Sequence, residues 1–142
     1  MRRGDLTYLD TSALLRIVLN EADALDELQQ SERLISSELL VVESLRSLDR
    51  LRLSGALSLD SAAKRRRILT EWLESVDLVV LQRPILARAS EPLPVPLGTL
   101  DALHLATALV VRERTQEALV LATHDRGLAL AARSFGFEVF GA

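Results

Sequence analysis

The chain has 142 residues, no cysteine and a formal net charge of -3 at pH 7. This length suits one domain with a sizeable core, so we expect a single domain over residues 1–142. The lack of cysteine excludes disulfides, thiolate metal sites and a cysteine nucleophile, and it fits a reducing cytoplasm. The negative charge excludes a strongly basic polyanion binder, so any nucleic acid must be held by local positive patches or through a bound cation.

Strand-like and helix-like patterns alternate along the chain. In chain order they predict a strand at 6–9, a helix at 13–19, a short helix at 24–30, a strand at 34–36, helices at 37–53 and 59–75, a strand at 76–81, helices at 83–90 and 98–114, a strand at 118–122, a helix at 125–134 and a strand at 137–140. Gly55 marks a helix end and Ser58 a helix start, whereas Pro92 prevents the helix at 83–90 from continuing. The apolar, β-branched run at 76–81 is typical of a buried strand.

Strands that alternate with helices are joined by right-handed crossovers. We therefore expect a three-layer α/β/α fold, in which a short, mainly parallel sheet is covered on both faces. Ligands of such sheets gather beyond the carboxyl ends of the strands. That edge is where functional side chains are expected.

Four acids from separate segments can meet at this edge. Asp10 and Asp125 each follow a predicted strand and precede a helix. Asp101 lies in the first turn of its predicted helix, and Glu43 lies one to two turns into another. Carboxylates that converge in this way are what a hard divalent cation such as Mg²⁺ requires.

Each acid also has a structural explanation when it is taken singly. Asp10 and Asp125 suit helix N-caps, Asp101 complements a helix dipole, and Glu43 suits a solvated face shared with Arg46. As a cluster, the four would repel one another, by about 4 kcal/mol for a pair ~4 Å apart at an effective dielectric near 20. A cluster therefore favours a bound cation or a proton on one of its members.

Five segments carry a resemblance to PIN domains. Together they cover nearly the whole chain, in the order and at the spacing typical of that family: LDTSALL at 9–15, SELLVVESLRSL at 37–48, LDALHLATAL at 100–109, ATHDRGLALAA at 122–132 and FGFEVF at 135–140. Any one of these motifs is weak alone, whereas the ordered set is specific.

The resemblance implies a single PIN-like domain that hydrolyses RNA phosphodiester bonds with one or two Mg²⁺ or Mn²⁺ ions and leaves 5′-phosphate and 3′-hydroxyl ends. It puts four acids in a metal site: Asp10, Glu43, Asp101 and Asp125. Asp10 and Asp101 are expected to bind metal directly, and Glu43 and Asp125 through water. Small hydroxyl residues are expected to support the first and last carboxylates: Thr11 or Ser12, and Thr123.

Other polar residues have ordinary explanations. His104 can share a helix face with Asp101, but the resemblance indicates a structural role, and His124 is interpreted as incidental. Trp72 is expected in the core. One dense basic run suits either a solvated helix face or a contact with the RNA backbone: Lys64, Arg65, Arg66 and Arg67.

Stand-alone PIN domains of this length resemble VapC toxins, which dimerise and are inhibited by a small antitoxin. The resemblance therefore implies an RNA substrate, an antitoxin partner, a homodimer and a cytoplasmic location. No apolar run approaches the ~18 residues that span a bilayer. Several apolar residues suit either a groove for an antitoxin helix or the core: Leu14, Leu15, Ile17, Leu25 and Leu28.

Other functions stay open. A PIN nuclease of RNA maturation or decay would use the same site without an antitoxin, and a neighbouring gene for a small DNA-binding protein would separate the two. A magnesium-binding signalling module expects a late lysine, but Lys64 is the only lysine. The intact acid set argues against an inactive PIN scaffold. Haloacid-dehalogenase-type phosphatases need a second aspartate where this chain has Ser12.

Overall fold

The computed structural model describes residues 6–31 and 33–142. Strands and helices alternate along this part of the chain: β1 Leu6–Leu9, α1 Thr11–Val18, the 3-10 helix η1 Asp26–Gln30, β2 Arg33–Ser37, α2 Leu39–Leu53, α3 Leu59–Glu74, β3 Val76–Val79, α4 Arg83–Ala89, α5 Thr99–Thr115, β4 Leu119–Ala122, α6 Arg126–Ser134 and β5 Glu138–Phe140.

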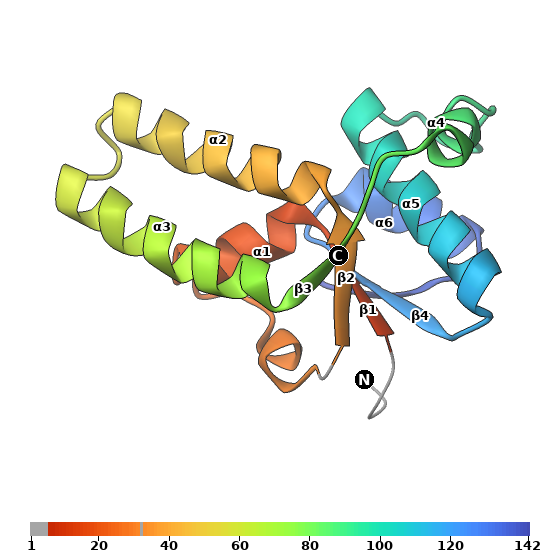
Figure 1. Ribbon diagram of the computed structural model, residues 1–142, viewed down its shortest axis with the longest axis horizontal. Coiled ribbons are helices and arrows are strands. Elements are labelled where there is room, and N and C mark those ends of the chain that lie inside the picture. The colour runs from red at the N-terminus through yellow and green to blue at the C-terminus, as the bar shows by residue number, and fades with distance from the viewer. Residues whose placement is uncertain (1–5, 32) are drawn as a thin grey trace.

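The five strands form one parallel sheet in the order β3-β2-β1-β4-β5, with β1 at its centre (Figure 1). The chain passes from β1 outward to β2 and β3, and then crosses to β4 and β5 on the other side. Connections therefore leave β1 and β4 in opposite directions. In open parallel sheets, ligands bind in the crevice outside the carboxyl ends of two such strands.

Helices cover both faces of the sheet, so the predicted three-layer arrangement is confirmed. One core cluster joins α5 and α6 to the side of the sheet that carries Leu6 and Tyr8. The other joins α1, α2 and α3 to the side that carries Leu9. Successive side chains of a strand point to opposite faces, which explains how one short strand supplies both clusters.

Each predicted element is found within two residues of its expected bounds. The Ser58 side chain caps α3 by accepting the Ser61 N–H at 3.1 Å, as expected. The expectation of a buried strand at 76–81 is wrong, because β3 ends at Val79 and lies at an edge of the sheet, beside β2. Leu78 of this edge strand is 39% exposed.

The apolar residues near α1 mostly belong to the core. Leu14 and Leu28 are buried, and Ile17 and Leu25 pack against the same cluster as Trp72. Leu15 is half-buried. Core packing therefore accounts for most of this set, and a groove for a partner helix stays a prediction. In the described ranges, no helix is long and apolar enough to cross a membrane.

Gly141 follows β5 in the left-handed region, with φ at 107°. A Cβ at this position would clash with the carbonyl of Thr123, at the end of β4. We predict that Gly141→Ala lowers the free energy of unfolding by about 1–3 kcal/mol, because backbone strain and the clash add together.

Urea denaturation measures this loss. Gly55→Ala is the matched control, because Gly55 also has a positive φ, at 82°, but has no atom within 4 Å of an added Cβ. An equal loss in the two variants would show that the approach to Thr123 contributes nothing.

Candidate metal centre

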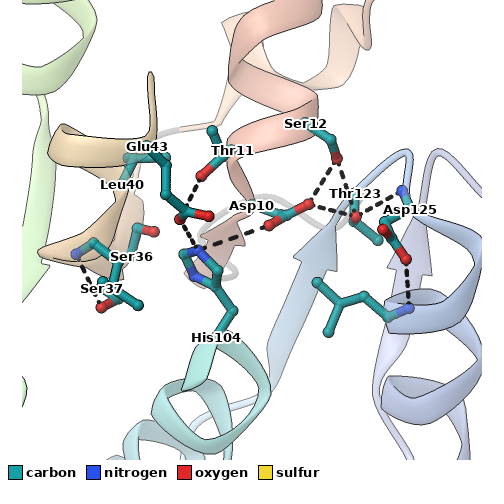
Figure 2. Close-up of polar contacts among 12 residues, drawn as sticks. Asp10, Thr11, Ser12, Ser36, Ser37, Leu40, Glu43, His104, Thr123 and Asp125 are labelled. Carbon is teal, nitrogen blue, oxygen red and sulfur yellow. Dashed lines mark hydrogen bonds and ion pairs between the residues drawn. The ribbon is translucent and has the colours of Figure 1, made fainter. Parts of the chain in front are cut away.

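Asp10 lies at the carboxyl end of β1, next to the carboxyl end of β4. Its backbone N–H donates to the Ala122 carbonyl at 3.0 Å, which continues the pairing of the two strands. Its side chain is almost fully buried, and Oδ2 accepts hydrogen bonds from Ser12 Oγ at 2.6 Å and Thr123 Oγ1 at 2.7 Å (Figure 2). Asp10 occupies the N-cap position of α1, yet its side chain makes no capping bond. Its carboxylate is thus positioned by hydroxyls from two segments.

Asp125 follows β4 and does cap a helix. Its Oδ1 accepts the backbone N–H of Leu128 at 2.8 Å, in the first turn of α6. Its own N–H donates to Thr123 Oγ1 at 3.0 Å. Thr123 therefore links the last aspartate to Asp10, and its hydroxyl supports the first carboxylate rather than the last.

Glu43 is half-buried on α2 and is held by two donors. Thr11 Oγ1 donates to Glu43 Oε1 at 3.0 Å, and His104 Nε2 lies 2.5 Å from the same oxygen (Figure 2). His104 Nε2 also lies 3.9 Å from Asp10 Oδ1. Thr11 and Ser12 thus support different acids, although they are neighbours in sequence.

A buried chain of hydrogen bonds leads from the sheet to Glu43. The Tyr8 hydroxyl accepts the Ser37 N–H at 3.2 Å and lies 2.7 Å from His104 Nδ1. Because the phenol oxygen already accepts from Ser37, its own proton is free to be donated to Nδ1. In the neutral imidazole, that leaves the proton on Nε2 to be donated to Glu43. Burial raises the pKa of Tyr8, so the phenol stays protonated.

The pKa shifts show that the acids share one electrostatic field. Burial and the charges of Asp125 and Asp10 raise the pKa of Asp101 to about 6. Burial is the largest single influence on Glu43 and acts to raise its pKa, but the hydrogen bond and charge of His104, together with the hydrogen bond from Thr11, lower the pKa overall. Burial opposes protonation of His104, yet Glu43 and Asp10 raise its pKa overall.

The donor set fits a hard cation in its chemistry. It consists of carboxylates, and one of them is a buried Asp10 whose Oδ1 accepts no hydrogen bond from the described residues. Within residues 6–31 and 33–142, no three histidine, aspartate or glutamate side chains are already arranged to hold an ion. A Mg²⁺ ion usually keeps several waters and takes one or two carboxylates, so such an arrangement is not required.

Sequence reasoning missed the part played by Tyr8 and His104. His104 had a detectable signal, because it lies three residues after Asp101 on α5. Tyr8 had none, because it belongs to a short buried strand and meets His104 across 96 positions of sequence. The role of His124 stays untested: its backbone N–H donates to Ser12 Oγ at 2.9 Å.

The basic run lies on α3. Lys64, Arg66 and Arg67 are exposed, whereas Arg65 is half-buried and donates to the Val18 carbonyl at 3.2 Å. A solvated helix face explains this placement, and a contact with RNA stays a prediction. Trp72 packs against the core, as expected.

We predict that Asp101 makes the metal-free protein less stable as the pH rises from about 4 to 6. In this window the folded state keeps a proton on Asp101 that the unfolded state, with an ordinary pKa near 3.9, has lost. Asp101→Asn should flatten this part of the stability profile and raise the melting temperature at pH 7 by a few degrees.

Thermal melts in chelator at several pH values test this expectation. Asp60→Asn is the control, because Asp60 is an exposed acid on α3. A profile for Asp101→Asn that parallels those of the wild type and the control would contradict it.

We predict that Tyr8→Phe lowers the free energy of unfolding by about 1–3 kcal/mol, because it leaves the buried Ser37 N–H without its acceptor. It should also allow the neutral His104 ring to carry its proton on either nitrogen. Nitrogen NMR of the ring should show Nε2 protonated in the neutral wild type and a mixture of tautomers in the variant. An unchanged tautomer would show that Tyr8 does not determine which nitrogen of His104 is protonated.

Comparisons with known proteins agree with this geometry. A family model described as "PIN domain" matches residues 7–134. The chain is similar to Ribonuclease VapC47 of Mycobacterium tuberculosis (strain CDC 1551 / Oshkosh), with 29% identity over 139 residues and 93% of each chain covered. Its fold resembles the crystal structure of PAE2754 from Pyrobaculum aerophilum, with a TM-score of 0.60, 24% identity, and 95% of this chain and 89% of that chain covered. Because the family match takes in all four acids and most of the sequence, the chain belongs to the PIN domain family.

Proposed function

We propose that the chain is a metal-dependent endoribonuclease, with residues 1–142 acting as a single PIN domain. The observation that carries this proposal is the state of Asp10. Its carboxylate is buried where the connections that leave β1 and β4 diverge, one oxygen is fixed by two hydroxyls, and the other is left for a ligand. The similarity to a protein named Ribonuclease VapC47 supports RNA as the substrate.

Asp10 and Asp101 would hold one or two Mg²⁺ or Mn²⁺ ions directly, and Glu43 and Asp125 would do so through water. When bound, such an ion supplies positive charge that activates water and stabilises the charge on a phosphate. Asp101 supports the assignment, since Asp10, Asp125 and Glu43 all raise its pKa and a cation would relieve this repulsion.

The remaining residues of the site act by positioning. Ser12 and Thr123 fix the Asp10 carboxylate, and Thr11 and His104 fix one oxygen of Glu43. The Leu128 N–H fixes one oxygen of Asp125. Asp10 then keeps one oxygen for an ion, and Glu43 and Asp125 each keep one oxygen for water. Hydrolysis joins the water oxygen to phosphorus and leaves the departing 3′ oxygen with a proton, so the products carry 5′-phosphate and 3′-hydroxyl ends.

We further infer a VapC-type toxin role, in which a small antitoxin protein restrains a cytoplasmic, homodimeric nuclease. The size of the chain and its similarity to Ribonuclease VapC47 over 93% of both chains support this role. Size-exclusion chromatography with light scattering tests the dimer. Induction of the gene in cells, alone and together with its neighbouring gene, tests the antitoxin.

We predict that the purified protein cuts mixed cellular RNA with Mg²⁺ or Mn²⁺ and not with chelator, and that Asp10→Asn abolishes cleavage. Sequencing of the cut ends gives the end chemistry and the site preference. Asp10→Asn should not lower the melting temperature in chelator, because loss of a repelling charge offsets weaker hydrogen bonds. Asp60→Asn controls for a general loss of charge and should cut normally. Normal cleavage by Asp10→Asn would refute the site.

A further inference from the structure

A groove leads away from the candidate site along α2. It has a volume of about 270 Å³, begins at Thr11 and Glu43, and continues past Arg46 and Arg50. Leu100, in the first turn of α5, also lines it. The groove is therefore continuous with the acidic cluster, yet its own charged side chains beyond Glu43 are cationic.

The spacing of these residues places them on one face of α2. Glu43, Arg46 and Arg50 are separated by three and four residues, which are neighbours on a helix surface. At 1.5 Å per residue, Arg50 lies about 10 Å along the helix axis from Glu43. This length spans about three phosphates of a stacked strand, at ~3.4 Å each.

The arginines of this face are not neutralised by their neighbours. Asp49 is shared, since it accepts from Arg46 at 3.1 Å and from Arg52 at 2.8 Å. Arg50 donates to the Ser47 hydroxyl at 3.1 Å, and no carboxylate of the described ranges pairs with it. Arg46 and Arg52 thus share one carboxylate, Arg50 pairs with none of those described, and Arg46 keeps 58% of its side chain exposed. Positive charge remains available to a ligand.

A polyanionic substrate needs such charge close to the acids. The chain carries a net charge of -3, and the four carboxylates repel a phosphate wherever a cation does not offset them. Cations that flank the cluster can hold the strand while its scissile phosphate lies among the acids. Val42 and Leu100, which are 60% and 49% exposed, add apolar surface for sugar and base faces.

We propose that this groove binds the sugar–phosphate backbone of single-stranded RNA next to the bond that is cut, with Arg46 and Arg50 each contacting a phosphate. This inference rests on the proposed ribonuclease function and names the surface that holds the substrate. Contacts of this kind set affinity and strand position and do not read sequence.

Binding of a short single-stranded RNA, followed by fluorescence anisotropy at several salt concentrations, tests the groove. The parent is the Asp10→Asn protein with Mg²⁺, so that cleavage does not intervene. Arg46→Gln with Arg50→Gln should weaken binding at low salt and reduce the slope of log K against log salt by about 1.4, since each single-strand phosphate contact contributes ~0.7. Arg114→Gln with Arg133→Gln is the matched control, because both arginines are exposed in the last turns of α5 and α6, far along these helices from Asp101 and Asp125, and it should leave the slope unchanged.

The outcomes are distinct. A parent that binds no RNA would overturn both the ribonuclease function and the groove. A parent that binds RNA with the same slope after the α2 substitutions, or an equal loss from the control pair on α5 and α6, would overturn the groove alone. Poly-glutamate serves as an acidic polypeptide probe. If its binding falls with the α2 substitutions while RNA binding does not, the groove binds a protein instead of RNA and the proposal is wrong. Unchanged melting temperatures will show that all the variants are folded.

Discussion

Mutual repulsion among carboxylates is the constraint around which this site is built. Burial raises the pKa of Asp101 to about 6 together with the charges of Asp125, Asp10 and Glu43, which all act on it. Repelling groups stay together only where rigid structure holds them. Here the structure is the end of a parallel sheet where neighbouring connections diverge, with β1 and β4 hydrogen-bonded up to Asp10. Packing of the core beneath the site must therefore offset the repulsion among the acids.

The acids are fixed without being neutralised. Ser12 and Thr123 orient Asp10, and the Tyr8–His104 pair with Thr11 orients Glu43. In the described part of the chain, no lysine or arginine forms an ion pair with any of the four acids. Hydroxyls, a backbone amide and an imidazole provide geometry and leave most of the negative charge uncompensated. This arrangement favours a bound cation, because carboxylates that are not already paired with a positive charge attract the cation more strongly.

The sequence predicts the scaffold well, since its signals are local. Helix and strand periods, Gly55 and Ser58 fix the elements, and the acids after β1 and β4 mark the ligand edge. The roles of individual side chains depend on distant partners. Asp10 and Asp125 both stand at a helix N-cap after a buried strand, yet only Asp125 caps its helix. Asp10 instead accepts from the hydroxyls of Ser12 and Thr123, and Thr123 reaches it across 113 positions of sequence. The edge position of β3 likewise depends on strand order, which no local pattern encodes.

Acids and cations occupy neighbouring parts of the site. Asp10 and Asp125 follow the ends of β1 and β4, and the cations of α2 begin one helical turn beyond Glu43. A polyanion that approaches such a surface is attracted by the cations of α2, and it can reach the acids only where a metal ion has offset the repulsion. A net charge of -3 is then compatible with binding of RNA. Binding that leads to cleavage therefore depends on both groups of charges. The cations of α2 alone would hold a strand without bringing its phosphate to the acids.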